Sequence, residues 1–428
     1  MVDFYAGCAY NGYSIFELGG LHMAHSDEFL TSNSKFHNSI KVIHYLKENP
    51  RATTADISQG CAMTQPTAYR VVKQLLDSNV ITQNEKVIAA NGRQPVLYSI
   101  SPTYAYALCI MLEKTCVTVC ATQLDGAVAQ SRRHEIISYR KKEEILDSIN
   151  DDISAMTQAL WTNPEERKRL RAICISVEAD IDIESGRILK FSGASCFDGF
   201  SIVEYFENRY GLPTRLNKLL YVEALASISN YCRYSFNHYI YLHIGVGFGA
   251  TIVIDQKIYM GAHGKAGELE RLKTQDGRSW EECYSTSNLY HRLLKYVSEN
   301  PDSELNNVMM NMLRTNRGNN SLMNIIDKAV ELECPMIEEI MENAIQNWAQ
   351  AIQLMDLLFD PEVIVIGGDI SDKTPRIFGS IRRALSEKED FNGVLLPAQY
   401  KTSLEDEVAQ DAANVLFETI CNDYAGAH

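Results

Sequence analysis

Three glycines alternate with larger residues in the segment Gly245-Val-Gly247-Phe-Gly249. Glycine has no Cβ and tolerates positive φ, so a turn of this composition lets the backbone close on a phosphate group. Apolar residues flank the turn, in YLHI before it and in ATIVI after it. The pattern predicts a β-hairpin whose bend has the form of a phosphate loop. A chain with such a loop either transfers phosphate or keeps the loop for another purpose.

A second group of residues that could bind a ligand lies near the N-terminus, in MTQPTAYRVVKQLLDSNVI. Ala68, Val71, Val72, Leu75 and Leu76 recur at helical spacing and predict one buried stripe. The opposite face carries donors and acceptors suited to base edges and phosphates. We therefore expect a DNA interface that consists of the residues around this polar face and one arginine from a later turn. Its expected members are Thr64, Gln65, Thr67, Tyr69, Arg70, Lys73 and Arg93.

The elements around this helix predict a winged helix-turn-helix. HNSIKVIHYLKENP is an amphipathic helix stopped by Pro50, and ATTADISQG is a short helix capped by Thr53 or Thr54 and ended by Gly60. Thr64 is the expected N-cap of the third helix. VITQ and PVLYSIS predict two strands, joined by a loop that ends in Asn91-Gly92-Arg93. The alternative is a small helical domain with a solvated polar face.

Length and composition indicate which class of protein this chain belongs to. A chain of 428 residues with 46% apolar and 22% charged residues predicts two or three folded domains. No run of 18 apolar residues occurs, and no basic residue precedes Lys35, so we expect neither membrane insertion nor a secretory signal. The eleven cysteines include no CxxC pair, which favours reduced thiols in a cytoplasmic protein.

Charge is unevenly distributed along the chain. The whole chain carries a net charge of −15. Residues 31–100 hold eight Lys or Arg and four acids, so this segment carries 8 − 4 = +4 and the remainder −19. A small basic module on an acidic body is typical of a DNA-binding head attached to an effector domain.

The rest of the chain predicts a two-lobed α/β body. Apolar strand segments occur in two successive sets separated by helical stretches, which indicates two sheets. We expect an N-terminal extension over residues 1–30, a winged helix-turn-helix domain over 31–100 and the body over 104–428. The extension contains aromatic residues, glycines and acids, and its role stays open between a disordered arm and a segment packed on a dimer partner.

Several motifs of the body resemble those of one family. Gly245–Ile254 is similar to a second phosphate loop, Gly261-Ala-His-Gly264-Lys-Ala-Gly267-Glu268-Leu to a sugar-binding segment, and Pro361–Gly368 to a late adenosine-side strand. The chain thereby resembles the ROK family of repressors, open reading frames and sugar kinases. The resemblance extends from the winged helix to the end of the chain. It implies an actin/hexokinase-like ATPase fold.

Departures from the family pattern bear on catalysis. Family kinases open the domain with an Asp-x-Gly-x-Thr turn, whereas this chain has Met111-Leu-Glu113-Lys-Thr115. The family base is the Asp of an Asn-Asp pair, but Asn217 precedes Lys218 here, and a gapped alternative places Leu219 or Leu220 at the base. The family Pro-Gly after the middle strand is Glu178-Ala179. We therefore expect no catalytic residues and no bound cofactor.

The resemblance also locates a metal site and a ligand site. The family binds zinc through a histidine and a cysteine cluster, but here the histidine position is Arg271 and the cluster retains only Cys283, so we expect no metal. His263 is expected to be a loop residue and not a zinc ligand. The residues expected at an effector pocket are Asn217, His263, Glu268 and Arg271. Arg271 favours an anionic effector, and the alternative is that it pairs with Glu268 or Glu270 in a pocket that binds nothing.

The sequence as a whole predicts a transcriptional regulator of carbohydrate uptake or metabolism genes, most simply a repressor. Its expected partners are double-stranded DNA with a palindromic operator, a second copy in a homodimer or a dimer of dimers, and a sugar, sugar phosphate or sugar acid as effector. Two alternatives remain: an active sugar kinase with a fused head, and a regulator controlled by a protein partner instead of a sugar.

Overall fold

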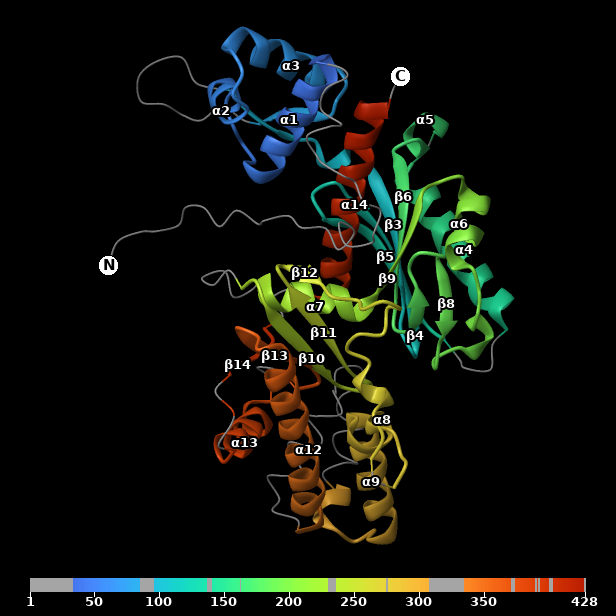
Figure 1. Ribbon diagram of the computed structural model, residues 1–428. Coiled ribbons are helices and arrows are strands. Elements are labelled where there is room, and N and C mark those ends of the chain that lie inside the picture. Colours follow the sequence, from blue (N-terminus) through green and yellow to red (C-terminus); the bar gives the residue numbers. More distant parts are fainter. Residues whose placement is uncertain are drawn as a thin grey trace. The chain divides into compact units, whose positions relative to one another are not determined.

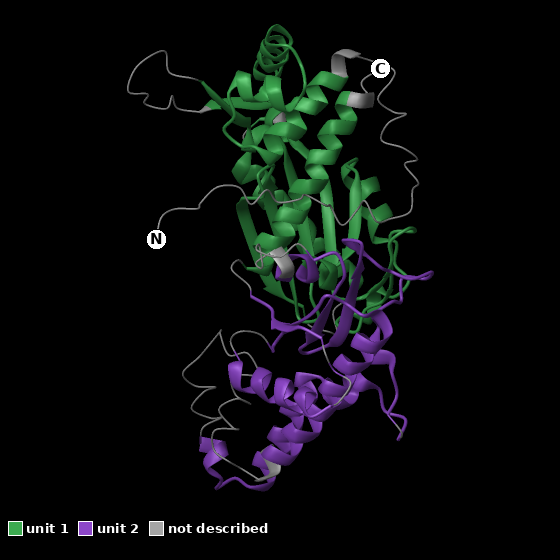
Figure 2. Cartoon of the chain, turned by 60° about the vertical axis from the view of Figure 1, so that its left-hand side comes forward, with its two compact units in different colours: residues 1–222, 402–428 green, residues 223–401 purple. Residues whose placement is uncertain are grey.

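The computed structural model describes residues 34–84, 96–136, 141–161, 163–229, 236–274, 276–307, 335–370, 374–388, 391, 393–399 and 403–426 (Figure 1). The chain forms two compact units, which Figure 2 colours separately. Unit 1 comprises residues 1–222 with 402–428, and unit 2 comprises residues 223–401. The predicted extension over residues 1–30 lies outside the described residues, and the predicted domain limits stay a prediction.

The N-terminal part of unit 1 is the predicted winged helix-turn-helix. Its helices are α1 (Ser34–Glu48), α2 (Thr54–Gly60) and α3 (Gln65–Asp77), and β1 (Ile81–Asn84) pairs antiparallel with β2 (Leu97–Ile100). Val42, Ile43 and Leu46 of α1 are buried, as are Ile57 of α2 and Leu75 of α3. These side chains form the small core that holds the three helices together.

The larger part of unit 1 is a five-stranded sheet in the order β5-β4-β3-β6-β9. Its strands are β3 (Tyr106–Leu112), β4 (Cys116–Gln123), β5 (Val128–Glu135), β6 (Leu170–Val177) and β9 (Thr214–Lys218). The first three form an antiparallel meander, and β6 and β9 add in parallel. A small hairpin of β7 (Asp180–Asp182) and β8 (Arg187–Lys190) follows β6.

Helices cover both faces of this sheet (Figure 1). The helices α4 (Lys142–Leu160) and α6 (Ile202–Tyr210) pack their buried apolar side chains on one face, and a short helix α5 (Pro164–Arg167) leads into β6. The C-terminal helix α14 (Leu404–Gly426) lies against β3, β4 and β6 on the other face. The sheet is therefore buried on both sides, as parallel strands with helical connections require.

Helix α14 also contacts the winged helix-turn-helix. The ring of Phe417 meets the ring of His44 edge-on at a centroid distance of 5.0 Å, and Lys47 Nζ lies 4.3 Å from the centroid of the same ring. Burial lowers the pKa of His44, with the Lys47 charge as the second cause. One helix thus touches both the DNA-binding fold and the sheet of unit 1.

Unit 2 repeats the sheet of unit 1. Its order is β12-β11-β10-β13-β14, again an antiparallel meander of three strands followed by two parallel ones. The strands are β10 (Tyr239–Ile244), β11 (Phe248–Ile254), β12 (Lys257–Ile258), β13 (Val363–Gly368) and β14 (Leu395–Pro397). Two copies of one unusual strand order form the two-lobed α/β architecture that the sequence predicted.

The core of unit 2 lies between this sheet and four helices. These are α8 (Trp280–Tyr284), α9 (Thr286–Glu299), α12 (Pro335–Phe359) and α13 (Pro375–Ser386). Helix α7 (Leu219–Ser229) begins directly after β9 at the boundary of the units. Among the helices that the structure describes, none combines the length and apolarity needed to span a bilayer.

Candidate nucleic-acid interface and ligand site

The start of α3 is fixed by the predicted cap. Thr64 Oγ1 accepts a hydrogen bond from the Thr67 backbone N–H at 3.4 Å and lies 2.9 Å from Thr67 Oγ1. Pro66 occupies the first turn, where its missing N–H costs no intrahelical bond. The predicted cap is thereby confirmed. Because Thr64 and Thr67 already pair with each other, any contact they make to DNA would come from the remaining capacity of their hydroxyls.

Helix α3 divides into a buried and an exposed face. Ala68, Val71, Val72 and Leu75 are buried as predicted, and Leu76 is half-buried. Gln65, Tyr69, Arg70 and Lys73 are exposed on the opposite face. Tyr69 is 63% exposed, so its ring and hydroxyl are accessible to a binding partner.

The second helix of the motif is fixed independently of α3. Thr53 caps α2 with a reciprocal pair of bonds: Asp56 N–H donates to Thr53 Oγ1 at 3.2 Å, and Thr53 N–H donates to Asp56 Oδ2 at 2.8 Å. The Thr53 hydroxyl, which also donates to this carboxylate, lowers the pKa of Asp56. Of the two candidate caps, the structure selects Thr53. The wing-tip Arg93 lies outside the described residues.

The turn between β3 and β4 occupies the place of the first phosphate loop. Two carboxylates lie there. Glu113 Oε2 accepts a bond from the Cys116 thiol at 2.9 Å and lies 3.3 Å from Arg133 Nη2. Glu178 accepts from the Lys114 backbone N–H at 3.0 Å. A protein carboxylate therefore takes one of the backbone donors that a phosphate would need, and the Lys114 ammonium lies 3.5 Å from the same carboxylate of Glu178.

The polar contacts at this turn also affect the Cys116 thiol. Burial, followed by the hydrogen bond to Glu113, raises the pKa of Cys116 to about 12. This cysteine is therefore an unreactive thiol. The turn as a whole is an internally paired structure, unlike the open glycine turn of the family kinases.

Asn217 and Lys218 end β9, where the family kinases place their base. Both side chains are buried, and Asn217 Oδ1 accepts from the Lys218 backbone N–H at 2.9 Å. Lys218 Nζ lies 5.7 Å from the centroid of the Tyr221 ring. A lysine ammonium has three donors and no acceptor, so Lys218 offers a substrate hydroxyl no general base.

Asn217 lies beside a buried acid that sequence reasoning missed. Asp411 of α14 is buried, and desolvation raises its pKa from 3.8 to about 7. The Asn217 amide and, more weakly, Arg215 offset part of this shift, whereas Glu418 adds to it. Asn217 Nδ2 is nevertheless buried without a hydrogen-bond acceptor at bonding distance among the described residues. The amide predicted to contact an effector thus faces the interior of unit 1.

The glycine hairpin of unit 2 is the predicted turn between β10 and β11. The Gly245 carbonyl accepts from the Thr286 backbone N–H of α9 at 2.8 Å, and Thr286 Oγ1 donates to Asp369 Oδ2 at 2.5 Å. A Cβ on Gly245 would lie 2.6 Å from His243 Nε2. The absence of a side chain at Gly245 therefore makes room for the protein's own imidazole.

His243 belongs to a polar cluster that sequence reasoning also missed. Its Nδ1 lies 2.9 Å from Glu223 Oε2 of α7, and the Tyr241 hydroxyl donates to the same oxygen at 3.0 Å. Glu223 and His243 are 20 residues apart in the sequence, so no local pattern could have paired them. The cluster packs an oriented imidazole against the glycine turn.

The segment after β12 contains three of the predicted effector residues. Gly267 has a φ of 83°, and a Cβ there would lie 2.0 Å from the Ala250 carbonyl oxygen, so only glycine fits. Next to it, Arg271 Nε lies 3.2 Å from Glu268 Oε2 and 3.5 Å from Glu270 Oε1. This is the pairing that the alternative interpretation of Arg271 anticipated.

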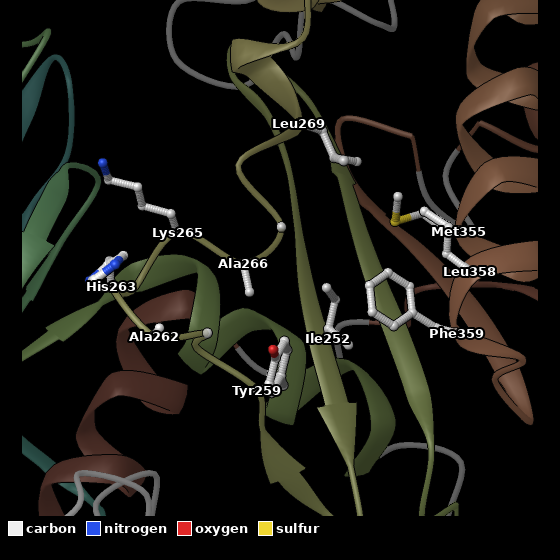
Figure 3. A pocket seen from close by; sticks show the side chains of 12 residues that line it. Ile252, Tyr259, Ala262, His263, Lys265, Ala266, Leu269, Met355, Leu358 and Phe359 are labelled. Carbon is white, nitrogen blue, oxygen red and sulfur yellow. The ribbon is translucent and has the colours of Figure 1, made fainter.

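His263 lines a cavity of about 370 Å³ in unit 2. In Figure 3 His263 and Lys265 lie on one side of this cavity, opposite Met355 and Phe359 of α12. Glu268 and Arg271 are not among its lining residues, and Asn217 belongs to the other unit. That these four residues form one effector site stays a prediction.

The region where the family binds zinc is a capped helix in this chain. Cys283 is buried on α8, which begins with a capping box between Ser279 and Glu282. Trp280 packs on Phe248 of β11 at a centroid distance of 6.0 Å. The segment is therefore held to the sheet by aromatic packing and backbone capping.

Comparison with known proteins places both parts of the chain. The model of the ROK family matches residues 107–390, and that of a winged helix-turn-helix DNA-binding domain matches residues 37–82. A xylose repressor of Bacillus spizizenii is 22% identical over 83% of this chain and 87% of its own length. A protein of Caldicellulosiruptor sp. is 23% identical, but the match spans 55% of this chain and 58% of that protein.

A solved structure supports the same fold. The crystal structure of a ROK family transcriptional regulator, described as a homologue of the E. coli MLC protein, superposes with a TM-score of 0.67. It covers 92% of this chain and 99% of that one, at 18% sequence identity. The likeness therefore includes the winged helix-turn-helix as well as both lobes.

Proposed function

This chain belongs to the ROK family, and from that premise we propose that it is a DNA-binding transcriptional repressor of carbohydrate uptake or metabolism genes. The observation that carries the proposal is the exposed face of α3, where Tyr69, Arg70 and Lys73 stand opposite a buried stripe. The similarity to a xylose repressor supports the carbohydrate context. A repressor of this kind acts where the chromosome is, in the cytoplasm.

Selection of bound fragments from the source genome tests this function directly. The full chain is incubated with sheared genomic DNA, and the retained fragments are sequenced. We expect recovery of a few sites with twofold symmetry, upstream of genes for sugar transport or breakdown. Retention without any enriched sequence would contradict a specific operator, and enrichment upstream of unrelated genes would contradict the carbohydrate role.

Twofold operators call for a homodimer. Two heads related by a symmetry axis double the contacts to DNA, and the spacing of the half-sites then follows from the separation of the heads. We propose a homodimer, or a dimer of dimers, as the binding species. Light scattering after gel filtration at micromolar concentration measures this, and a strictly monomeric chain on and off DNA would contradict it.

The body is proposed to be catalytically inactive. Glu178 occupies the Lys114 backbone donor at the turn where family kinases hold phosphate, Glu113 is bonded to Cys116 there, and Lys218 replaces the family base. We expect the purified chain to hydrolyse no ATP above background in the presence of candidate sugars. A coupled ADP assay measures this, with an added sugar kinase as the positive control. Turnover of about 1 s⁻¹ would establish the alternative, an active kinase.

The effector is proposed to be a sugar, sugar phosphate or sugar acid. Asn217, His263, Glu268 and Arg271 are its proposed contacts, and Arg271 favours an anionic group, provided the effector displaces its present carboxylate partners. A thermal-shift panel of the three ligand classes tests the proposal. A shift with one class that Glu268→Gln removes would support it. No shift with any class would favour the alternative, control by a protein partner.

A further inference from the structure

We infer that unit 1 carries a binding site for a small organic anion, separate from the predicted effector residues. A cavity of about 420 Å³ opens between the C-terminal half of α4, the end of α5 and the start of β6. Its size falls within the range of small-molecule sites. None of the residues assigned to DNA or to the effector lines it. The inference therefore does not depend on the proposed function.

The inner wall of the cavity is mainly apolar, with Ser154 and Thr157 of α4 as its hydroxyl-bearing residues. Trp161, at the end of α4, is 3% exposed, and its ring meets Tyr106 of β3 edge-on at 5.2 Å. Ile153 is buried on α4, and Leu212 adds a half-buried side chain from the loop after α6. Because the tryptophan is anchored on the central strand, the wall is preformed and a ligand gains contact area without ordering it.

A tyrosine closes one side of the cavity. The Tyr210 hydroxyl donates to Asn150 Oδ1 at 2.7 Å, which fixes the ring. Burial raises the pKa of Tyr210, so the phenol stays neutral at physiological pH. The guanidinium of Arg209 lies 6.0 Å from the centroid of the same ring. This side therefore offers a flat aromatic surface with a neutral phenol.

The mouth of the cavity is cationic. Arg167 and Lys168 line it, and no described lining residue is acidic. Lys168 Nζ already has a carboxylate partner in Glu165 at 2.9 Å. Arg167 forms no ion pair with any described residue, and its side chain is exposed. An arginine of this kind presents a planar fork that matches a carboxylate or a phosphate.

The chemistry of the wall and the mouth defines the ligand class. An apolar interior with one available guanidinium at the rim suits a molecule with an aromatic or branched aliphatic body and one anionic group. A free sugar lacks the apolar body, and a bare phosphate lacks the contact area. The site is thus suited to an aromatic carboxylate or a similar organic acid.

Binding of 2-naphthoate to the full chain tests the inference. Equilibrium dialysis measures its affinity, with the neutral alcohol 2-naphthalenemethanol as the matched ligand. We expect saturable binding of the carboxylate and at least about tenfold weaker binding of the alcohol, since the alcohol cannot form the charged hydrogen bond. Equal binding of both ligands, or no saturable binding of the carboxylate, would overturn the inference.

Matched variants locate the binding event. Arg167→Glu is expected to weaken 2-naphthoate binding at least tenfold, whereas Arg169→Glu, an exposed arginine that does not line the cavity, is expected to leave it unchanged. Leu212→Trp is expected to fill the cavity and abolish binding. If that variant fails to fold, the comparison of Arg167→Glu with Arg169→Glu still tests the inference. Loss of binding on Lys265→Glu but not on Arg167→Glu would move the site to the cavity in unit 2 and overturn the inference.

Discussion

Replacement of both Arg70 and Lys73 by alanine is expected to weaken binding of the full chain to operator DNA by about 100-fold or more. Both side chains are exposed on α3, on the face opposite its buried stripe. A charged hydrogen bond contributes roughly 1.5–3 kcal/mol, so removal of two such bonds accounts for this effect. For each phosphate that is no longer neutralised, the slope of log K against log salt is also expected to become shallower by about one.

Two further variants separate positioning from sequence readout. Gln65→Ala and Tyr69→Ala remove exposed side chains at the start of α3 without changing charge. If they read base edges, discrimination between operator and scrambled duplex falls by roughly 1–3 kcal/mol, while non-specific affinity changes little. Arg93→Ala, in the predicted wing, is expected to weaken both specific and random DNA binding and to relax an A·T preference beside the half-site.

A salt titration of wild type and variants on operator and scrambled duplexes measures all of these effects. Lys41→Ala is the matched control, because it removes one exposed positive charge from α1. We expect this control to retain the wild-type affinity and salt slope to within about threefold. A flat salt slope for the wild type, or binding weakened as much by Lys41→Ala as by the double replacement of Arg70 and Lys73, would mean that α3 is not the DNA-reading element.

The winged helix-turn-helix was predictable because the sequence features that define it are local. The Thr64 cap, Pro66 in the first turn and the buried stripe of α3 all lie within one segment of sequence, and each is found in the structure. The sequence predicts strands around the turn at residues 123–126 but not the extent of β5, Val128–Glu135, because most of its side chains are polar and half-buried or exposed at an edge of the sheet. Periodicity identifies elements with one apolar face and misses an edge strand of this kind.

The candidate sites were predictable only in part, because their partners are distant in sequence. The sequence identifies Glu113 and Glu178 as substitutions, but their meeting at one turn depends on the pairing of β3 with β6. The contact between His243 and Glu223 depends likewise on how α7 packs on β10. Long-range pairing of this kind is fixed by the fold and not by any spacing along the chain.

Asp411 shows the same limit most clearly, since an aspartate on a helix is ordinarily expected to face solvent. It lies instead between α14 and the sheet, near the buried thiols of Cys109 and Cys174. Burial raises the pKa of Cys174 as well, and the carboxylate charge of Asp411 contributes to that shift. Ionisation of an acid buried in this position lowers the free energy of unfolding, because the carboxylate loses its hydration.

Asp411→Asn is therefore expected to stabilise the protein at pH 8 and to remove much of its pH dependence. The folded chain holds the Asp411 proton up to about pH 7, whereas the unfolded chain releases it near 3.8. The free energy of unfolding of the wild type consequently falls as pH rises through this window and is level above it. A shift of about three units corresponds to roughly 4 kcal/mol at 1.36 kcal/mol per unit.

Urea unfolding of the wild type and Asp411→Asn between pH 5 and pH 8 measures this effect. The stability difference between the two proteins is expected to grow by about 3 kcal/mol over that range in favour of the variant, since Asn carries no charge to desolvate. Asp151→Asn, an exposed position on α4, is the matched control and is expected to give a constant difference. Because α14 also contacts His44 and Lys47 of α1, the gain should include the winged helix-turn-helix. A difference that does not change with pH would mean that Asp411 is solvated in the folded chain and that α14 packs only loosely on the sheet.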